Sequence, residues 1–503
     1  MADAIRRGEA SSAEATESVL GRIEAVDGRV KAYLTVTPEA ARAKATEADR
    51  ARKAGEATSP LAGVPGALKD IVCTKGIPST AASRILESYV PPYSATVAER
   101  LDAAGLPVVG KTNLDEFAMG SSTENSGFFP THNPWDLDRV PGGSSGGSAA
   151  AIAAGEALWS IGTDTGGSIR QPASLCGVVG LKPTYGLVPR RGLIAFASSL
   201  DQAGPITRDV RDAALILQLI AGHDPGEATS LPSPVPDYMA AIEEGPDRMN
   251  GLRVGVVSEL AGEGLQEGVR LRFTEAVRML EKMGADVGEV SLPTFEYGID
   301  AYYLIAPAEA SANLARYDGV RYGLRVDTPD VTDVATMNAR SRAAGFGPEV
   351  KRRIMLGTYS LSAGYYDAYY GKAQKVRTLI IRDFARAYGD FDVLVSPTSP
   401  TTAFRIGERT DDPLTMYLSD VCTVPTSLAG ATAISIPCGL APEDGLPVGL
   451  QFMGPALSEA TLLGAAYAVE QELGFAEKPP IWNERGGQVE RGGAAGLTGG
   501  SGR

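Results

Sequence analysis

Two glycine- and serine-rich segments constrain this chain more than any other feature of its sequence. They cover residues 142–148 and 162–170, and an alanine-rich stretch followed by a short apolar run joins them. The joining residues predict a helix over 148–154 and a strand over 157–161. Glycine lets the backbone turn tightly enough to direct several N–H groups at one point, and serine supplies hydroxyl groups. Two such loops joined by a helix and a strand indicate a chemical site more strongly than one isolated glycine loop.

Strands and helices alternate along most of the 503 residues. Helices are expected over 10–28, 95–105, 208–221, 269–283 and 459–473, and strands over 106–109, 178–181, 252–257, 393–395, 433–437 and 448–452. This alternation predicts the α/β class with a mostly parallel sheet. We expect an N-terminal helical segment over 1–60 packed on the core, a catalytic domain over 61–482 and a glycine-rich disordered tail over 483–503.

Charge and cysteine usage argue against several functional classes. The chain has 47 basic and 61 acidic residues and a net charge of −14, so it is a poor candidate for gripping nucleic acid by itself. Its four cysteines are scattered, which predicts neither a zinc site nor a disulfide framework and fits a reducing compartment. We see no apolar run of about 18 residues and no apolar core of a signal peptide. The sequence therefore predicts a cytoplasmic protein without a membrane span.

A nucleophilic serine needs a base that takes up its proton. The only two histidines, His132 and His223, lie in turn-like sequence, so a Ser-His-Asp site is an unfavoured alternative. A buried lysine can serve instead, because desolvation disfavours its ammonium form. Lys69 lies in an apolar run, although an ordinary exposed lysine at a strand end also fits. The candidate hydroxyl groups are those of Ser144 and Ser168.

The second glycine-rich segment could also stabilise the negative charge that develops during acyl transfer. Backbone N–H groups at Thr165, Gly166 and Gly167 would surround the second serine, while Ser144 would relay its proton to the lysine. A phosphate-binding loop in a non-catalytic protein is the rival interpretation. Neither glycine-rich segment has the spacing of a P-loop or of a dinucleotide-binding loop.

Residues 142–173, together with 61–70, resemble the amidase signature family. The resemblance implies an α/β fold in which layers of helices sandwich a large mixed β-sheet. It also implies a Ser-cisSer-Lys triad. In that triad Lys69 is the base, Ser144 is the bridging serine in a cis peptide, and Ser168 is the nucleophile. The oxyanion hole would be the loop just before the nucleophile.

Further stretches at 110–120, 180–186, 349–354 and 412–417 resemble one branch of the family, the A subunits of bacterial tRNA-dependent amidotransferases. Such a protein is a glutaminase that works in a heterotrimer with subunits B and C. It supplies ammonia for the ATP-dependent conversion of Glu-tRNA(Gln) to Gln-tRNA(Gln). The resemblance implies no cofactor or metal in this chain, because a partner would hold ATP, Mg and most tRNA contacts. The alternative is a stand-alone amidase acting on small acyl amides.

Free glutamine carries an α-carboxylate and an α-ammonium, so its site needs one cation and one anion apart from the nucleophile. The resemblance implies Arg352 as the carboxylate clamp and Asp420 as the ammonium partner. It implies Tyr303 as a hydrogen-bonding residue on the substrate side. Arg353 competes with its neighbour for the clamp, and ordinary surface or core positions stay open for all of these residues.

Overall fold

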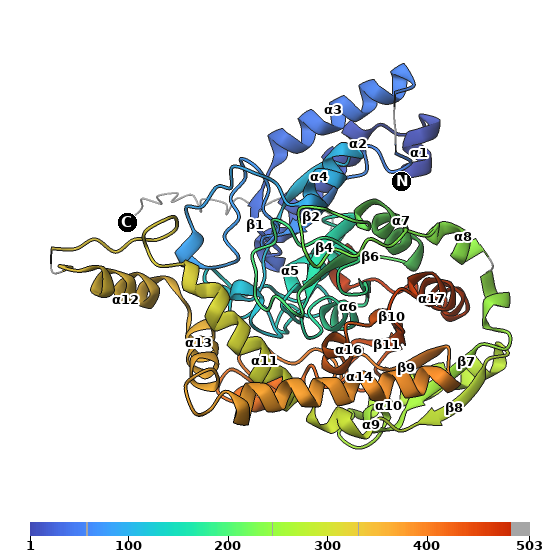
Figure 1. Ribbon diagram of the computed structural model, residues 1–503. Coiled ribbons are helices and arrows are strands. Elements are labelled where there is room, and N and C mark those ends of the chain that lie inside the picture. The colour runs from blue at the N-terminus through green and yellow to red at the C-terminus, as the bar shows by residue number, and fades with distance from the viewer. Residues whose placement is uncertain (57–58, 244, 330, 484–503) are drawn as a thin grey trace, which may run out of the picture.

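A sheet of eleven strands crosses the molecule in the computed structural model, which describes residues 1–56, 59–243, 245–329 and 331–483. The strand order within this described part is β1-β3-β2-β4-β6-β5-β10-β11-β9-β7-β8 (Figure 1). The strands are β1 (Tyr33–Val36), β2 (Gly66–Lys69), β3 (Val108–Thr112), β4 (Trp159–Asp164), β5 (Val179–Lys182), β6 (Gln202–Thr207), β7 (Arg253–Val257), β8 (Asp286–Val290), β9 (Val393–Pro397), β10 (Thr432–Leu440) and β11 (Pro447–Gly454).

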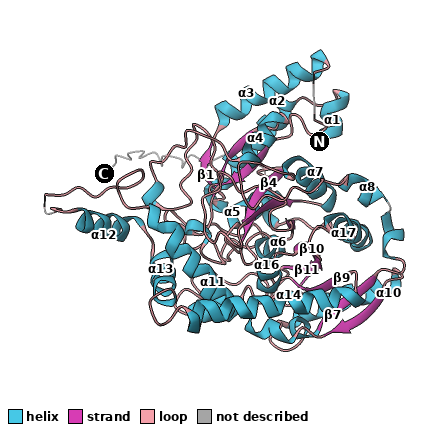
Figure 2. Cartoon of the chain, in the orientation of Figure 1, coloured by secondary structure: helices cyan, strands magenta, loops and turns pink. Residues whose placement is uncertain are grey.

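Helices surround this sheet, as Figure 2 shows. The first group is α1 (Ala2–Arg7), α2 (Ser12–Val30), α3 (Pro38–Ala54), α4 (Thr96–Ala103), α5 (Gly146–Ala154), α6 (Arg170–Cys176), α7 (Val210–Ile220), α8 (Tyr238–Glu243) and α9 (Ser258–Ala261). The second group is α10 (Glu267–Lys282), α11 (Gly298–Asn313), α12 (Val334–Gly345), α13 (Pro348–Ser360), α14 (Lys372–Asp390), α15 (Pro413–Leu418), α16 (Val424–Ala429) and α17 (Glu459–Leu473).

The sheet is mixed. Parallel pairs join β2 to β3 and β4, and β7 to β8 and β9. The six other pairs among the described strands are antiparallel. The prediction of a mostly parallel sheet is therefore wrong, because a helix between two strands does not fix the direction in which the second strand returns. The mixed sheet implied by the family resemblance is confirmed.

Helices cover both faces of the sheet. Helix α5 packs on α6, whereas α7 packs on α8 and α17. Both α5 and α7 contact β4 and β6, and every residue of those two strands is buried. Strands buried on both sides need a cover on each face, so α5 with α6 lies on one face, and α7 with α8 and α17 lies on the opposite face. This arrangement is the expected sandwich of helices around the sheet.

The ends of the chain relate to the core in different ways. Helix α2 packs on α5, and β1 pairs with the edge of β3, so residues of the N-terminal segment extend the sheet. The domain boundary expected near residue 60 stays a prediction. Most of the tail expected to be disordered, residues 484–503, lies outside the described residues. In the part that is described, no helix combines the length and the apolar character needed to cross a bilayer.

Candidate active site

Lys69 is the last residue of β2, and its amine lies in a fully buried group of hydroxyls. Its Nζ is 2.8 Å from Ser144 Oγ, 2.8 Å from Ser145 Oγ and 2.9 Å from Thr163 Oγ1. Burial lowers the pKa of Lys69 to about 7, and more distant carboxylates oppose that shift only in part. A neutral amine has two donors and one lone pair, so two of these hydroxyls can accept and one can donate. The site therefore suits a lysine that exchanges a proton with a hydroxyl.

The direction of the strands explains why this lysine meets the second glycine-rich segment. Strand β2 runs parallel to β3 on one side and β4 on the other. Parallel neighbours end at the same edge of the sheet, so the end of β2 lies beside the loop of residues 165–169 that follows β4. The first glycine-rich segment reaches the same edge because α5 begins there, capped by Ser145, and its chain leads on into β4.

The first predicted serine lies in an irregular stretch of backbone just before α5. The peptide bond between Gly143 and Ser144 is cis, as the resemblance implied. The carbonyl of Ser144 accepts a hydrogen bond from the backbone N–H of Asp115, 3.3 Å away. The N–H of Gly143 donates to the side chain of Gln171 at 3.0 Å. Both sides of the cis bond are therefore held by buried neighbours, which fixes Ser144 against the lysine.

Ser168 lies directly beside these residues. Its carbonyl accepts a hydrogen bond from the N–H of Ser145 at 3.1 Å, so the two loops are joined at this point. The residue is 7% exposed. Within the described part of the chain, its hydroxyl has no hydrogen-bond partner, in contrast to the hydroxyl groups around Lys69. A free hydroxyl with slight access to the outside is what a nucleophile for a small substrate requires.

The loop before this hydroxyl offers free backbone donors. Among the described residues, the N–H groups of Thr165, Gly166, Gly167 and Ser168 donate to no protein atom. The φ angle of Gly167 is 147°, and a Cβ there would lie 2.1 Å from Thr423 Oγ1, so only glycine fits. That threonine hydroxyl also donates to the carbonyl of Gly166 at 2.7 Å. The loop is thus fixed in place while its backbone N–H groups stay free, which is what the stabilisation of a developing oxyanion requires.

Asp420 is buried close to the same loop. Its Oδ2 accepts a hydrogen bond from Ser121, while its Oδ1 is buried without a hydrogen-bond partner in the described structure. A Cβ added to Gly167 would lie 3.4 Å from that free oxygen. Burial raises the pKa of Asp420 to about 7, and the nearby charge of Arg353 opposes the shift. An unpaired carboxylate oxygen next to the nucleophile loop fits a cationic group of a substrate.

The two neighbouring arginines of α13 have different surroundings. The side chain of Arg353 is 3% exposed, and its Nε donates to Glu349 Oε1 at 2.8 Å. Its guanidinium carbon lies 5.0 Å from the centre of the Tyr303 ring. The side chain of Arg352 is 43% exposed and pairs with the other oxygen of Glu349. The contacts place Arg353, not Arg352, in one buried group with Tyr303, and the predicted clamp role of Arg352 stays a prediction.

Several residues of the site had not been identified from the sequence. Ser145 and Thr163 contact the lysine, as described above. Asp201 accepts a hydrogen bond from Thr165 Oγ1 at 2.7 Å, and burial raises the pKa of Asp201 to about 6. Thr423 fixes the nucleophile loop from the far end of the chain. Ser145 and Thr163 lie inside the two glycine-rich segments and so carried a signal in the sequence, whereas Asp201 and Thr423 lie outside them.

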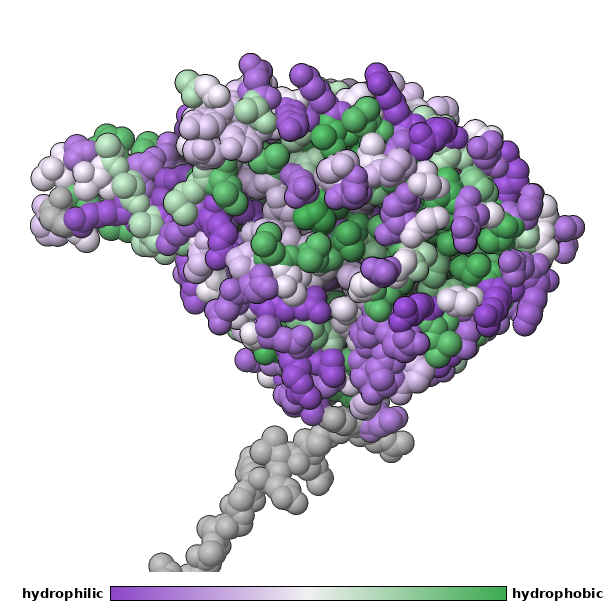
Figure 3. Space-filling view, turned by 90° about the horizontal axis from the view of Figure 1, so that it is seen from below, coloured by the Kyte–Doolittle hydropathy of each residue, from purple (hydrophilic) through white to green (hydrophobic). Residues whose placement is uncertain are grey.

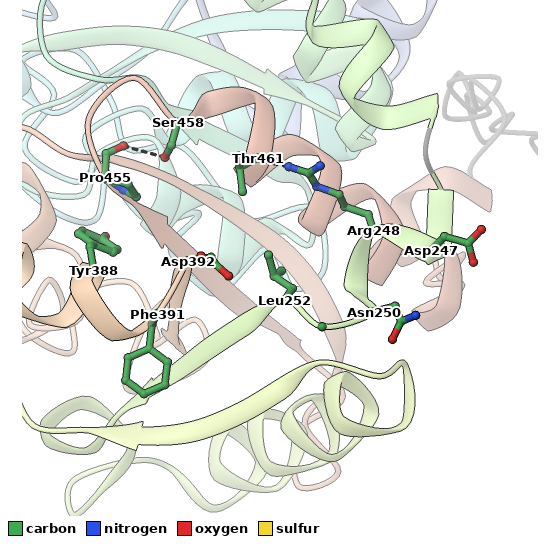
Figure 4. Close-up of a pocket in the computed structure, with 11 residues that line it drawn as sticks. Asp247, Arg248, Asn250, Leu252, Tyr388, Phe391, Asp392, Pro455, Ser458 and Thr461 are labelled. Carbon is green, nitrogen blue, oxygen red and sulfur yellow. Dashed lines mark hydrogen bonds between the residues drawn. The ribbon is translucent and has the colours of Figure 1, made fainter.

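A separate hollow lies away from these residues, between β7, α14 and α17 (Figure 4). Its lining includes Leu252, Tyr388, Asp392, Ser458 and Thr461. The side chain of Ser458 is turned back onto the carbonyl of the nearby proline, and the hollow contains none of the predicted site residues. It offers no group of nucleophile and base, so the cluster of hydroxyls around Lys69 at the end of β2 is the better candidate.

Other side chains with catalytic potential lie elsewhere. The imidazole of His132 is bonded to the carbonyl of Leu137 and that of His223 to the carbonyl of Ser230. The four cysteines are free and buried. Across the described ranges, no group of three or more His, Cys, Asp or Glu side chains is placed to hold a metal ion. A serine and lysine site is the arrangement that the chain assembles.

Comparisons with known proteins show the family of the chain. A family model described as Amidase matches residues 14–463. The chain is 60% identical over 480 residues to the A subunit of glutamyl-tRNA(Gln) amidotransferase from Moorella thermoacetica, covering 95% of the chain and 97% of that relative. The crystal structure of the protein of that name from Thermotoga maritima has a TM-score of 0.76 at 45% identity, covering 94% and 93%. The peptide amidase of Stenotrophomonas maltophilia has a TM-score of 0.81 at 34% identity, covering 96% and 97%.

Proposed function

The chain belongs to the amidase family, and from this we propose that it is the glutamine-hydrolysing A subunit of a tRNA-dependent amidotransferase. It releases ammonia from the side-chain amide of glutamine, and the complex uses the ammonia to convert Glu-tRNA(Gln) to Gln-tRNA(Gln). The identity of 60% to a protein of that kind extends over nearly the whole chain. The observation that carries the chemistry is the unbonded Ser168 hydroxyl beside a buried lysine and four free backbone donors.

The geometry supports a two-step acyl transfer. Ser168 Oγ bonds to the amide carbon while its proton passes through the Ser144 hydroxyl to the neutral amine of Lys69. The free N–H groups of residues 165–168 hold the oxyanion. Collapse of this intermediate breaks the C–N bond, and the lysine returns the proton through the same relay to the departing ammonia. Water then attacks the ester by the same path and releases glutamate.

Two buried charges suit the two ends of glutamine. The free Oδ1 of Asp420 would accept the α-ammonium, and Arg353 would bind the α-carboxylate through its terminal nitrogens. Those nitrogens have no hydrogen-bond partner in the described structure. Arg353 replaces Arg352 in this proposal because its guanidinium is buried and lies over the Tyr303 ring, and because its charge acts on Asp420. Tyr303 then forms one wall of the substrate pocket.

A stand-alone amidase acting on small acyl amides is the second candidate. The likeness to a peptide amidase favours it, because that enzyme has the same fold and overall size. The buried charges at Arg353 and Asp420 argue for the first candidate, since a neutral acyl amide would leave Asp420 Oδ1 and the terminal nitrogens of Arg353 without a charged partner.

The proposal includes partners. We propose subunits B and C as the other members of a heterotrimer, with ATP, Mg and most tRNA contacts on a partner and no cofactor in this chain. A net charge of −14 suits a protein that handles only glutamine. On α13, Met355, Leu356 and Tyr359 are exposed, and Figure 3 shows further apolar groups between charged ones on the face seen from below. Exposed apolar residues of this kind are typical of a surface that another chain covers. Work on aminoacyl-tRNA implies a cytoplasmic location.

The test is glutamine hydrolysis by the purified chain, with and without subunits B and C. Ser168→Ala should lower kcat by on the order of 10⁴-fold or more. Arg353→Ala should raise KM for glutamine by on the order of 100-fold, because the carboxylate loses a charged bidentate partner. If Ser168→Ala keeps its activity, another residue is the nucleophile. If the wild-type chain hydrolyses simple acyl amides as readily as glutamine, the second candidate is correct.

A further inference from the structure

We propose that Glu349 and Tyr417 form a brace that orients Arg353, and that this brace makes the enzyme selective for amides that carry an α-carboxylate. The inference rests on the proposed function, because it concerns the same substrate pocket. Glu349 and Tyr417 act through the arginine and do not touch the substrate, so they are positioning residues.

The brace is a pair of hydrogen bonds to one carboxylate oxygen. Glu349 Oε1 accepts from Arg353 Nε at 2.8 Å and from Tyr417 Oη at 3.0 Å. Glu349 and Arg353 lie one turn apart on α13, whereas Tyr417 comes from α15. All three residues are buried. Glu349 therefore links the Nε of Arg353 to Tyr417 on the second helix, α15. The terminal nitrogens of the arginine stay free to bind a substrate.

Aromatic rings fix the arginine from another direction. The rings of Tyr303 and Tyr417 are stacked, with centroids 3.7 Å apart and planes 20° from parallel. The guanidinium carbon of Arg353 lies 5.0 Å and 5.4 Å from these two ring centroids. Such distances allow cation–π attraction, which is stronger for a desolvated cation. Helices α11, α13 and α15 thus hold one guanidinium in one orientation.

Glu349 and the two arginines that it pairs with carry one positive charge between them. Arg352 pairs with the second oxygen of Glu349, so one carboxylate serves two guanidinium groups. Of the two, Arg352 is partly exposed to water and Arg353 is buried. A substrate carboxylate would neutralise the charge of Arg353, which is buried and cannot be stabilised by water. A neutral group at that position would gain nothing from the brace, which is why the brace should control selectivity.

The experiment compares glutamine with its α-amide, which lacks the α-carboxylate but keeps the side-chain amide and the α-ammonium. The full chain is co-purified with subunits B and C. The assay separates the product of side-chain amide hydrolysis from any product of hydrolysis at the α-amide, so that only the first reaction is counted. For the wild type we expect kcat/KM to favour glutamine by on the order of 100-fold or more. Tyr417→Phe keeps the stacked ring and removes only the hydroxyl. It should reduce that preference about tenfold, mainly by raising KM for glutamine.

Glu349→Gln should reduce the preference further, because it removes the charge that anchors both arginines. If this variant does not fold, the tyrosine variant alone decides the test. Tyr388→Phe is the matched control, because it removes a tyrosine hydroxyl in the distant hollow of Figure 4. It should leave the preference unchanged.

The possible results are distinct. If the wild type shows no preference for glutamine over its α-amide, the proposed function fails. If the wild type shows the preference and Tyr417→Phe keeps it in full, the brace is overturned. If Tyr417→Phe slows both substrates equally, the hydroxyl has only a structural role and the brace is again overturned. A selective loss for glutamine supports it.

Discussion

Two lysines on neighbouring strands, Lys69 on β2 and Lys111 on β3, are equally buried but have different neighbours. The amine of Lys69 touches only hydroxyl groups. The amine of Lys111 lies 3.3 Å from Asp70 Oδ1 and donates to Ser79 Oγ at 2.7 Å. Burial lowers the pKa of both lysines, but for Lys111 the adjacent carboxylate opposes the shift. Burial alone therefore does not make a base, because a carboxylate neighbour opposes the loss of the proton from the amine.

A third buried lysine adds to the comparison. Burial lowers the pKa of Lys182 to about 7 as well, yet among the described residues its amine is bonded only to the carbonyl of Pro183, at 3.0 Å. It has the low pKa of a base without a hydroxyl that could pass a proton to it. What distinguishes Lys69 is the group of three hydroxyls at its amine, one of them on Ser145, whose backbone is bonded to the nucleophile loop.

The largest effect that would test this comparison is the loss of the catalytic base. Lys69→Met should lower kcat for glutamine by on the order of 10⁴-fold while the protein stays folded, because no buried carboxylate loses its partner. Steady-state kinetics measure the loss of kcat, and thermal unfolding shows whether the variant stays folded. Lys182→Met is the control and should keep kcat within about threefold, with stability lowered by at most about 1.5 kcal/mol. Equal loss in both variants would mean that the hydroxyl neighbours do not matter.

The reverse pattern is expected for Lys111. Lys111→Met leaves Asp70 as a buried carboxylate without its cation and should lower the free energy of unfolding by about 3 to 5 kcal/mol. The folded fraction should keep kcat within about tenfold. Denaturant unfolding with a parallel activity assay checks this result, and Asp70→Asn combined with Lys111→Met should recover part of the stability. A stable but inactive Lys111→Met protein would break the comparison.

The smallest effect concerns pH. Lys69 is active without its proton, so kcat/KM for glutamine should fall as pH falls below about 7 and level off above it. The carboxyl of Asp420 also takes up a proton near pH 7, which weakens binding of the α-ammonium in the same direction. The fall should thus exceed tenfold per pH unit in the wild type and return to about tenfold in Asp420→Asn. A profile that declines from pH 7 to 9 would contradict this assignment.

The sequence predicted those parts of the fold in which apolar spacing dominates. Helices such as α17 and strands such as β10 and β11 lie within a few residues of their predicted positions. Strand β6 was missed, because its sequence Gln-Ala-Gly-Pro-Ile-Thr contains glycine and proline, which are rare in strands. It forms because β4 and β5 give it antiparallel partners on both sides. Such pairing partners are distant in sequence and leave no local signal.

The site was predictable where it lies inside a motif. Lys69, Ser144 and Ser168 stand in or beside glycine-rich sequence, and the structure brings them to one edge of the sheet. Their catalytic roles stay predictions until variants are assayed. Arg352 and Arg353 could not be separated from sequence, because neighbouring helix residues point about 100° apart and either could face inward. The packing of α11 and α15 on α13 decides which one is buried.

The proton relay comes from residues 69–168, whereas the groups proposed to recognise the substrate come from residues 303–420. The two stretches meet only in the folded molecule, through contacts such as the hydrogen bond that Ser121 donates to Asp420. Evolution can therefore change what such an enzyme accepts by altering one half of the gene while the other half is inherited unchanged. Grafting helices α11 to α15 from a relative onto this scaffold is accordingly a direct route to a new specificity.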